Sequence, residues 1–289
     1  MIYAYGVTQQ GPCHVKSGQV CQDAHKYIKC SEHLAVGAIT DGLGSELYSD
    51  MASRLAADTS VEYCTEHIDE STSDDDILTV IHDAFTLAQD TIEHEAKERG
   101  YELDQCDTTL SLVVFKDGIV YYGHSGDGGI IVYTESGMYK SITQQQRDDH
   151  GRVFPLFFRE EKWVFGKFEE RVSSVMLATD GMFEIFFPVY IREEPVNIYV
   201  ALSQFFMDKE SLGVQEKGEE ILQGQMNEFI ANISEAQVND DKTVLVIIDS
   251  NIEVHLQTEE YYKEPDWQKL KRAYEDAWKR KAYPHLFKE

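Results

Sequence analysis

Aspartates stand beside several strand-like segments of this chain, at positions where one edge of a sheet could collect their side chains. Apolar runs at 34–40, 175–179 and 243–248 are each bordered by aspartate, and a glycine-rich turn at 123–129 holds another. The residues concerned are Asp23, Asp41, Asp127, Asp180, Asp240 and Asp241. Gathered together, such carboxylates repel one another unless they are protonated or bridged by cations. Oxygen ligands of this kind suit the hard divalent ions Mg²⁺ and Mn²⁺.

This pattern points to hydrolysis of a phosphate ester. Two divalent ions about 3.5–4 Å apart can hold one water between them and activate it as a nucleophile. A glycine after an aspartate, as in Asp41-Gly42, lets a backbone carbonyl turn toward an ion. A single Asp-Gly pair is a weak signal, because the dipeptide is common in turns. Asp117-Gly118 closes a predicted hairpin and is such a case, so we assign it no chemistry.

Six short motifs built on these residues occur in a characteristic order. They are Gln22-Asp23-Ala24, Asp41-Gly42-Leu43-Gly44-Ser45, Asp107-Thr108-Thr109-Leu110, Gly126-Asp127, Thr179-Asp180-Gly181-Met182 and Asp240-Asp241-Lys242-Thr243. In this order they resemble the metal-dependent protein phosphatases of the phosphatase 2C family, over about residues 3–249. The chain is most similar to a divergent bacterial branch of the family, in which a histidine, here His14, precedes a Cys-Gln-Asp-Ala segment that starts here at Cys21.

The resemblance implies the fold, the reaction and the ligands. The expected fold is α+β, a four-layer αββα sandwich of two antiparallel sheets flanked by helices. The expected reaction is Mg²⁺- or Mn²⁺-dependent hydrolysis of phosphoserine or phosphothreonine on proteins. Asp41 would bridge two ions, the Gly42 carbonyl would bind the second, and Asp180 and Asp240 would bind the first. Asp241 is the alternative to Asp240, because the doubled aspartate leaves the register open by one residue.

Two further aspartates receive roles from the same resemblance. Asp127 matches the aspartate that holds a third, weaker ion in bacterial members. Asp23 would order an ion-bound water. The substrate would be a phosphorylated protein, and the enzyme would counteract a Ser/Thr kinase.

Four departures from the family pattern affect the phosphate grip and the metal surroundings. Gly18 stands where the family has a phosphate-binding arginine, and Gly128-Gly129 stands where Ser-Arg is usual. Gln22 replaces a common glutamate, and Leu43 replaces a histidine proposed as general acid in some members. We therefore expect an intact metal core with an altered grip on the substrate phosphate.

Two nearby side chains are candidates to replace the missing arginine. His14 and Lys16 stand in the first motif region, and we expect both to bind the substrate. We also expect His14 to be catalytic, together with Asp23 and Asp41. The alternative for His14 is an ordinary surface histidine. The alternative for Lys16 is a solvated lysine.

The composition of the chain disfavours several classes of binding partner and cellular location. The 289 residues carry 52 acidic and 26 basic side chains, a net charge of −26, which disfavours binding to nucleic acid or to anionic membrane. No apolar run is long enough for a membrane span, and the N-terminal residues lack the pattern of a signal peptide. The five cysteines show no C-x-x-C spacing, which favours reduced thiols in a cytoplasmic protein.

Periodicity gives the expected elements. Strands are predicted at 2–7, 34–40, 109–115, 119–122, 130–133, 172–179 and 243–248. Helices are predicted after a cap at Ser45, from Ile77 to a stop at Gly100, and from Val214 to Ile233. The aromatic segment 144–170 is either a flap or ordinary packing on a sheet, and we favour packing.

The C-terminal residues differ from the rest. Residues 259–289 hold 8 basic and 7 acidic side chains, in contrast to the acidic remainder. Trp267, Leu270, Tyr274 and Trp278 follow helical spacing. We expect a catalytic domain at 1–250 and a helical extension at 251–289, which either docks on the body or binds a partner.

Two other function classes remain open from the sequence. A catalytically weak phosphatase-like module could bind or scaffold phosphorylated partners in a kinase–phosphatase system, with the extension as its contact. A metal-dependent hydrolase of a small phosphorylated molecule is the third option. The oligomeric state does not follow from the sequence.

Overall fold

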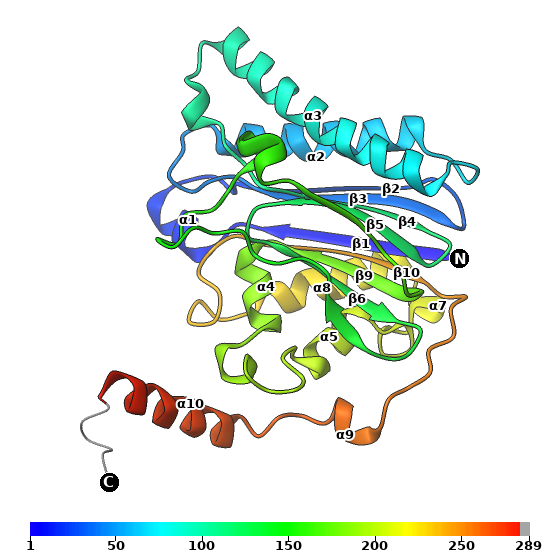
Figure 1. Cartoon of the computed structure of the whole chain (residues 1–289), viewed down its shortest axis with the longest axis vertical. Coiled ribbons are helices and arrows are strands. Elements are labelled where there is room, and N and C mark those ends of the chain that lie inside the picture. The colour runs from blue at the N-terminus through cyan, green and yellow to red at the C-terminus, as the bar shows by residue number, and fades with distance from the viewer. Residues whose placement is uncertain (284–289) are drawn as a thin grey trace.

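Two five-stranded antiparallel sheets lie face to face in the computed structural model, which describes residues 1–283 (Figure 1). The first sheet has the order β1 (Ile2–Gln9), β10 (Lys242–Asp249), β9 (Val172–Ala178), β6 (Gly129–Thr134), β7 (Tyr139–Ser141). The second has the order β2 (Asp23–Lys29), β3 (Leu34–Asp41), β4 (Leu110–Lys116), β5 (Ile119–Ser125), β8 (Val164–Phe168). Helices cover both outer faces, so the predicted four-layer α+β sandwich is confirmed.

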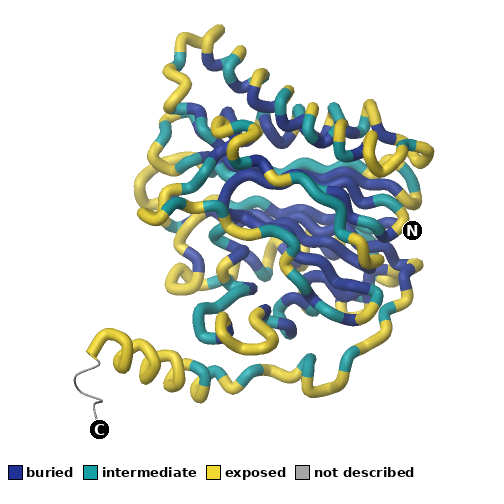
Figure 2. The backbone as a smooth tube through the Cα atoms, in the orientation of Figure 1, coloured by how far each residue is buried: buried dark blue, intermediate teal, exposed yellow. Residues whose placement is uncertain are grey.

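The central strands are apolar on both faces because each sheet is covered on both sides. In β10, Leu245 and Ile247 join the core between the sheets, whereas Val244 and Val246 join the core under the helices. Successive side chains of a strand point to opposite faces, so a doubly covered strand reads as a continuous apolar run. Figure 2 shows the buried strands as the middle of the molecule.

Two long helices cover the second sheet. They are α2 (Ser49–His67) and α3 (Asp74–Arg99). The α3 helix begins with a Ser73 cap that accepts a hydrogen bond from the amide of Asp76. It ends at Gly100, as predicted, and this glycine has a left-handed conformation. Its apolar stripe, which includes Ile77, Ile81 and Phe85, is buried against the sheet.

Shorter helices cover the first sheet. They are α4 (Asp180–Phe186), α5 (Val200–Met207), α6 (Lys209–Leu212), α7 (Val214–Lys217) and α8 (Glu219–Ala231). The connections hold α1 (Pro12–Ser17) and three 3₁₀ turns, η1 (Leu103–Gln105), η2 (Leu156–Glu161) and η3 (Val189–Ile191).

Two helix predictions need correction. The predicted cap at Ser45 is wrong, because α2 begins at Ser49 and residues 43–48 form a turn beside the site. The single helix predicted from Val214 to Ile233 is interrupted at Gly218, whose φ of 74° ends α7 before α8 begins. Glycine adopts this left-handed conformation at low cost, and the periodic apolar pattern continues across it.

The strand β2 was not predicted, because its sequence DAHKYIK lacks an apolar run. It lies at the edge of the second sheet, where polar residues and lysine are tolerated. Successive side chains of β2 still point to opposite faces of the sheet: Ile28 packs toward the helices and Tyr27 toward the other sheet.

The aromatic segment 144–170 contains both packed and exposed parts. It includes β8, and Trp163 and Phe165 pack edge-on against Phe85 at centroid distances of 5.4 and 5.1 Å. Phe157 and Phe158, in contrast, are 50% and 38% exposed. Packing on the sheet therefore accounts for the later aromatics of the segment and leaves the pair in η2 at the surface.

The C-terminal segment leaves β10 and runs past the first sheet to α9 (Glu259–Tyr262) and α10 (Trp267–Ala282) (Figure 1). Trp267 contacts Tyr199 and Tyr274 contacts Tyr190, whereas Trp278 is 54% exposed. The start of α10 thus touches the body, and its second half lies exposed (Figure 2). The predicted extension continues through 284–289, which lie outside the described residues.

Within residues 1–283, no helix combines the length and apolar character that a bilayer crossing requires. All five cysteines fall in this range, and each is a free thiol.

Candidate active site

A small pocket of about 130 Å³ opens where the ends of both sheets meet. The residues that line it are His14, Asp41, Gly42, Leu43, Gly44, Thr109, Asp127, Val153, Asp180 and Asp240. Four of these are aspartates predicted from the sequence, and they come from four separate segments of the chain. The fold therefore brings Asp41, Asp127, Asp180 and Asp240 together around one space.

Asp41 stands at the end of β3, directly opposite Asp23 at the start of β2. Its amide N–H donates to Thr109 Oγ1 at 2.9 Å, and its carbonyl accepts from the Thr108 hydroxyl at 3.0 Å and from the Thr109 amide at 2.8 Å. These bonds give the Asp-Thr-Thr-Leu motif a physical role, because its two threonines hold the backbone that carries Asp41.

Gly42 is required by a close approach of backbone to backbone. A Cβ atom at this position would lie 2.5 Å from the carbonyl oxygen of Ser49. The Gly42 amide donates to the carbonyl of Gln22 at 3.0 Å, so the turn after β3 is tied to the residue before β2.

Asp127 and Asp180 enter the pocket from the loop before β6 and from the first turn of α4. Carboxylate oxygens of Asp41, Asp127 and Asp180 all lie within 4.8 Å of one another. Arg147 Nη2 lies 2.7 Å from Asp127 Oδ2 and 3.0 Å from Asp180 Oδ2. A cationic side chain thus already bridges two of the aspartates.

The doubled aspartate divides into two different environments. The Asp240 side chain is 60% exposed and lines the pocket. The Asp241 side chain is buried, and its two oxygens accept from the amides of Gly11 and Gln22, each at 2.6 Å. Asp241 is therefore used in holding the loops together, and the geometry favours Asp240 as the residue available to an ion.

His14 is buried beside both of these carboxylates. Its Nδ1 lies 2.9 Å from Asp241 Oδ2, and its Nε2 lies 3.9 Å from Asp240 Oδ1. The alternative of an ordinary surface histidine is therefore excluded by its burial, since the residue is 6% exposed and lines the pocket.

Burial and crowding raise the pKa values of three aspartates at the site. Burial, followed by repulsion from Asp23 and Asp180, raises the pKa of Asp41 well above its ordinary value. Burial and then Asp241 likewise raise the pKa of Asp23. Burial, Asp127 and Asp240 raise the pKa of Asp180 to about 7. A cluster of oxygen donors with this repulsion fits hard divalent cations, which would offset it.

The other sequence candidates lie differently. The Lys16 ammonium pairs with the carboxylate of Glu235, and Lys16 does not line the pocket. Gly18 is the exposed residue that ends α1. Gln22 is buried, and its side-chain amide donates to Ser49 Oγ at 2.7 Å, while Leu43 lines the pocket as an apolar residue.

The Gly128-Gly129 departure has a steric cause in this chain. A Cβ atom at Gly129 would lie 2.1 Å from the ring of Phe183 in α4. An aromatic ring of α4 therefore occupies the space that a side chain at position 129 would enter.

Sequence reasoning missed two residues that contact the site aspartates. Arg147 belongs to the segment 144–170, whose sequence stands out for its aromatic residues. Thr179 donates from its hydroxyl to Asp23 Oδ2 at 2.8 Å, a contact that its motif does not predict. The available signal for Arg147 was a single basic residue in a stretch rich in glutamine, which does not point to a site by itself.

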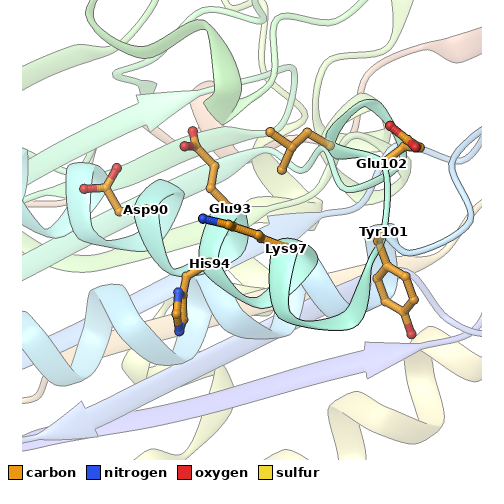
Figure 3. A pocket seen from close by; sticks show the side chains of 7 residues that line it. Asp90, Glu93, His94, Lys97, Tyr101 and Glu102 are labelled. Atoms are coloured by element: carbon orange, nitrogen blue, oxygen red, sulfur yellow. The ribbon is translucent and has the colours of Figure 1, made fainter.

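A larger pocket of about 460 Å³ lies along the C-terminal half of α3, and it shares no lining residue with the aspartate pocket (Figure 3). Asp90 and Glu93 on its rim each accept from Arg159 Nη2 at 2.8 Å. Arg159 has a φ of 50°, so these ion pairs clamp a strained turn of η2 onto α3. We assign this pocket no chemistry.

The sequence matches the family model described as Protein phosphatase 2C over residues 10–231. Because the match covers most of the chain, this protein belongs to the phosphatase 2C family, and the family predicted from the motifs is confirmed. A search of the curated proteins found no significant match.

Solved structures share the fold at low sequence identity. A bacterial serine phosphatase superposes with a TM-score of 0.60 at 14% identity, covering 88% of this chain and 99% of that one. The serine/threonine phosphatase Stp1 from Staphylococcus aureus gives 0.59 at 15% identity, with 86% and 95% covered. RsbX in complex with magnesium gives 0.50 at 14% identity, with 86% and 94% covered.

Proposed function

We propose that this protein is a Mg²⁺- or Mn²⁺-dependent phosphatase acting on phosphoserine or phosphothreonine in proteins. The observation that carries the proposal is the convergence of Asp41, Asp127, Asp180 and Asp240 on one pocket. Burial and repulsion from neighbouring aspartates raise the pKa of Asp41 and of Asp180. Family membership supports it. Among the fold neighbours, RsbX was solved in complex with magnesium.

The chain would supply the following groups. Asp41, the Gly42 carbonyl, Asp180 and Asp240 would hold two divalent ions, and Asp127 would hold a third. When bound, such ions activate a water molecule and neutralise charge on the phosphate. Asp23, fixed by the Thr179 hydroxyl, would orient that water through hydrogen bonding.

The two side chains predicted to bind the substrate phosphate differ in position. We propose that His14, which lines the pocket, contacts the phosphate or the leaving oxygen. The role predicted for Lys16 would require its ammonium to leave Glu235. The physiological substrate would be a protein phosphorylated by a Ser/Thr kinase.

We propose that the protein works in the cytoplasm, because free thiols are typical of proteins in a reducing compartment.

Hydrolysis assays with p-nitrophenyl phosphate and a phosphothreonine peptide test the proposal. We expect turnover with Mn²⁺ or Mg²⁺, none with EDTA, and a loss of at least about a hundredfold in Asp180→Asn. Asp117→Asn is the matched control, because Asp117 lies in the hairpin between β4 and β5. Absence of turnover with either ion from folded protein would contradict the proposal.

A panel of nucleotides and sugar phosphates, run beside the phosphopeptide, separates protein substrates from small ones. We expect higher kcat/KM for the peptide. Preference for one small phosphorylated molecule would replace the protein phosphatase with a small-molecule hydrolase.

A binding module is the second candidate, and the exposed second half of α10 favours it. A cavity of about 670 Å³ lies between the start of α10 and the 191–200 loop, with Ile191, Val196 and Leu270 among its lining residues. A scaffold would retain a captured phosphoprotein in Asp41→Asn and lose it when 264–289 are removed. A catalyst would lose turnover in Asp41→Asn and would keep it when 264–289 are removed.

A further inference from the structure

The site needs a cation for the substrate phosphate, and the two positions at which the family supplies arginine hold glycine here. Gly18 lies exposed at the end of α1, and the space beside Gly129 is filled by Phe183. Neither position contributes a positive charge. Beside the contact proposed for His14, a permanent positive charge for the phosphate would therefore have to come from another residue.

Arg147 is anchored next to the pocket by its backbone surroundings. It pairs with Val153 in an isolated bridge that closes the short hairpin 147–153, and Val153 itself lines the pocket. The neighbouring residues are tied to the loop of Asp127: the Gln146 amide donates to the Gly126 carbonyl at 2.8 Å, and Gln145 Nε2 donates to the Asp127 carbonyl at 2.7 Å. The base of the Arg147 side chain therefore stays beside the site.

The two shortest contacts of the guanidinium, in contrast, are with carboxylates that a metal ion would also use. It contacts Asp127 and Asp180, and it lies 3.7 Å from Glu184. The Arg147 side chain is 34% exposed, so it has solvent on one side.

A divalent ion shared by Asp127 and Asp180 and the guanidinium cannot occupy the same carboxylate oxygens. An ion bound at these oxygens would displace the guanidinium, while the hairpin would keep Arg147 next to the pocket. A phosphate monoester dianion in the pocket would then lie beside the released guanidinium. Arginine suits this task because its planar fork binds phosphate oxygens in pairs.

We propose that Arg147 is an exchangeable counter-ion: it pairs with Asp127 and Asp180 in the metal-free protein and binds the substrate phosphate once the ions are in place. The proposal rests on the proposed phosphatase function and names the residue that replaces the missing arginine. It also explains why Gly18 and Gly129 are tolerated.

The first test is direct Mn²⁺ binding, measured without substrate by electron paramagnetic resonance of the free ion. Arg147→Gln removes a cation that competes with Mn²⁺ for the carboxylates. The affinity of the weakest site for Mn²⁺ should therefore rise by about three- to tenfold, as expected for the loss of one partly screened charge. Arg152→Gln is the matched control, because Arg152 lies in the same hairpin, is 78% exposed and pairs with Asp148 instead. We expect it to bind Mn²⁺ as wild type does.

The second test is calorimetric binding of inorganic phosphate to the Mg²⁺-loaded protein. Loss of charge-assisted hydrogen bonds in Arg147→Gln should weaken phosphate binding about 10- to 100-fold. Arg147→Lys keeps the positive charge but lacks the planar guanidinium. Its affinity for phosphate should lie between those of Arg147→Gln and wild type. The KM for the phosphothreonine peptide should rise in parallel. Circular dichroism and thermal melting confirm that each variant is folded.

The outcomes separate this inference from the proposed function. Equal Mn²⁺ and phosphate binding in Arg147→Gln and Arg152→Gln overturns the role of Arg147, even if wild type is an active phosphatase. Phosphate binding that depends on Arg147 in a protein without turnover overturns the phosphatase and retains the role of Arg147. A wild-type protein that binds no Mn²⁺ overturns both.

Discussion

The hydroxyl of Thr179 donates a 2.8 Å hydrogen bond to the carboxylate of Asp23, and the two residues belong to opposite sheets. Thr179 follows β9 and immediately precedes Asp180, whereas Asp23 begins β2 opposite Asp41. The same Thr179 oxygen accepts from the amide of Thr243 in β10 at 3.2 Å. The Thr179 side chain therefore links the segment that carries Asp180 to the strand pair that carries Asp41.

Thr179→Val should destabilise the protein by about 1–3 kcal/mol at nearly unchanged volume. The substitution removes one of the hydrogen bonds to the buried Asp23 carboxyl and leaves the Thr243 amide without its partner. Urea denaturation followed by circular dichroism measures this. Thr179→Ser keeps the hydroxyl and should recover most of the loss. Equal midpoints for the valine variant and wild type would show that the bond contributes nothing to stability.

The metal-free protein should lose stability as the pH rises from 6 to 8. The pKa of Asp180 is raised to about 7, so the folded state holds a proton that the unfolded state has already released. That contribution is present at low pH and is lost as the pH rises through 7. The pKa of Glu46 is also raised to about 7, chiefly by burial, and adds to the slope. Melting temperatures in EDTA across this range measure it, and Asp180→Asn should have a shallower slope than Asp117→Asn.

Added Mn²⁺ should stabilise the protein more at pH 8 than at pH 6. The ion binds ionised carboxylates, so it must displace the protons that the raised pKa values of Asp41 and Asp180 retain at lower pH. The difference in melting temperature between Mn²⁺ and EDTA, determined at each pH, is the measurement. A difference independent of pH would argue against ion binding at these aspartates.

Gly129→Ala should be destabilising by about 1–3 kcal/mol, the usual cost of overpacking a close-packed core. The new Cβ atom would lie 2.1 Å from the Phe183 ring, which must move. In the Phe183→Ala background the same substitution should cost much less. A double-mutant cycle by urea denaturation gives the coupling, and additive effects would contradict steric contact as the reason for glycine here.

The length of the C-terminal segment should affect stability in two steps. The Tyr261 hydroxyl accepts from the amide of Tyr139 at 2.8 Å, and the Tyr262 hydroxyl donates to the carbonyl of Gly137 at 3.0 Å. A chain ending at Lys263 keeps both bonds, and its melting temperature should stay within about 3 °C of wild type, since what it loses is mostly exposed surface. A chain ending at Asn251 loses both bonds and should melt clearly lower. Equal melting of the two truncations would show that 252–263 does not support the first sheet.

The sequence by itself determined the layers and most of the strands. Strands such as β4 and β10 are buried on both faces, so most residues in them are apolar and the strand is recognisable in the sequence as a continuous apolar run. The six motifs also determined the family, because their order along the chain reflects a shared fold and needs no knowledge of contacts. The edge strand β2 was not predicted, because an edge strand tolerates polar residues and its sequence therefore lacks a clear apolar pattern.

Tertiary structure alone decided which chemical groups face each other. Adjacent in sequence, Asp240 and Asp241 lie in opposite environments, because the backbone at the start of β10 turns one toward the pocket and buries the other against two amides. The pairing of Arg147 with Asp180 spans 33 residues, and that of Thr179 with Asp23 spans 156. Contacts between segments so far apart depend on how two sheets pack, and no local pattern of residue types encodes that packing.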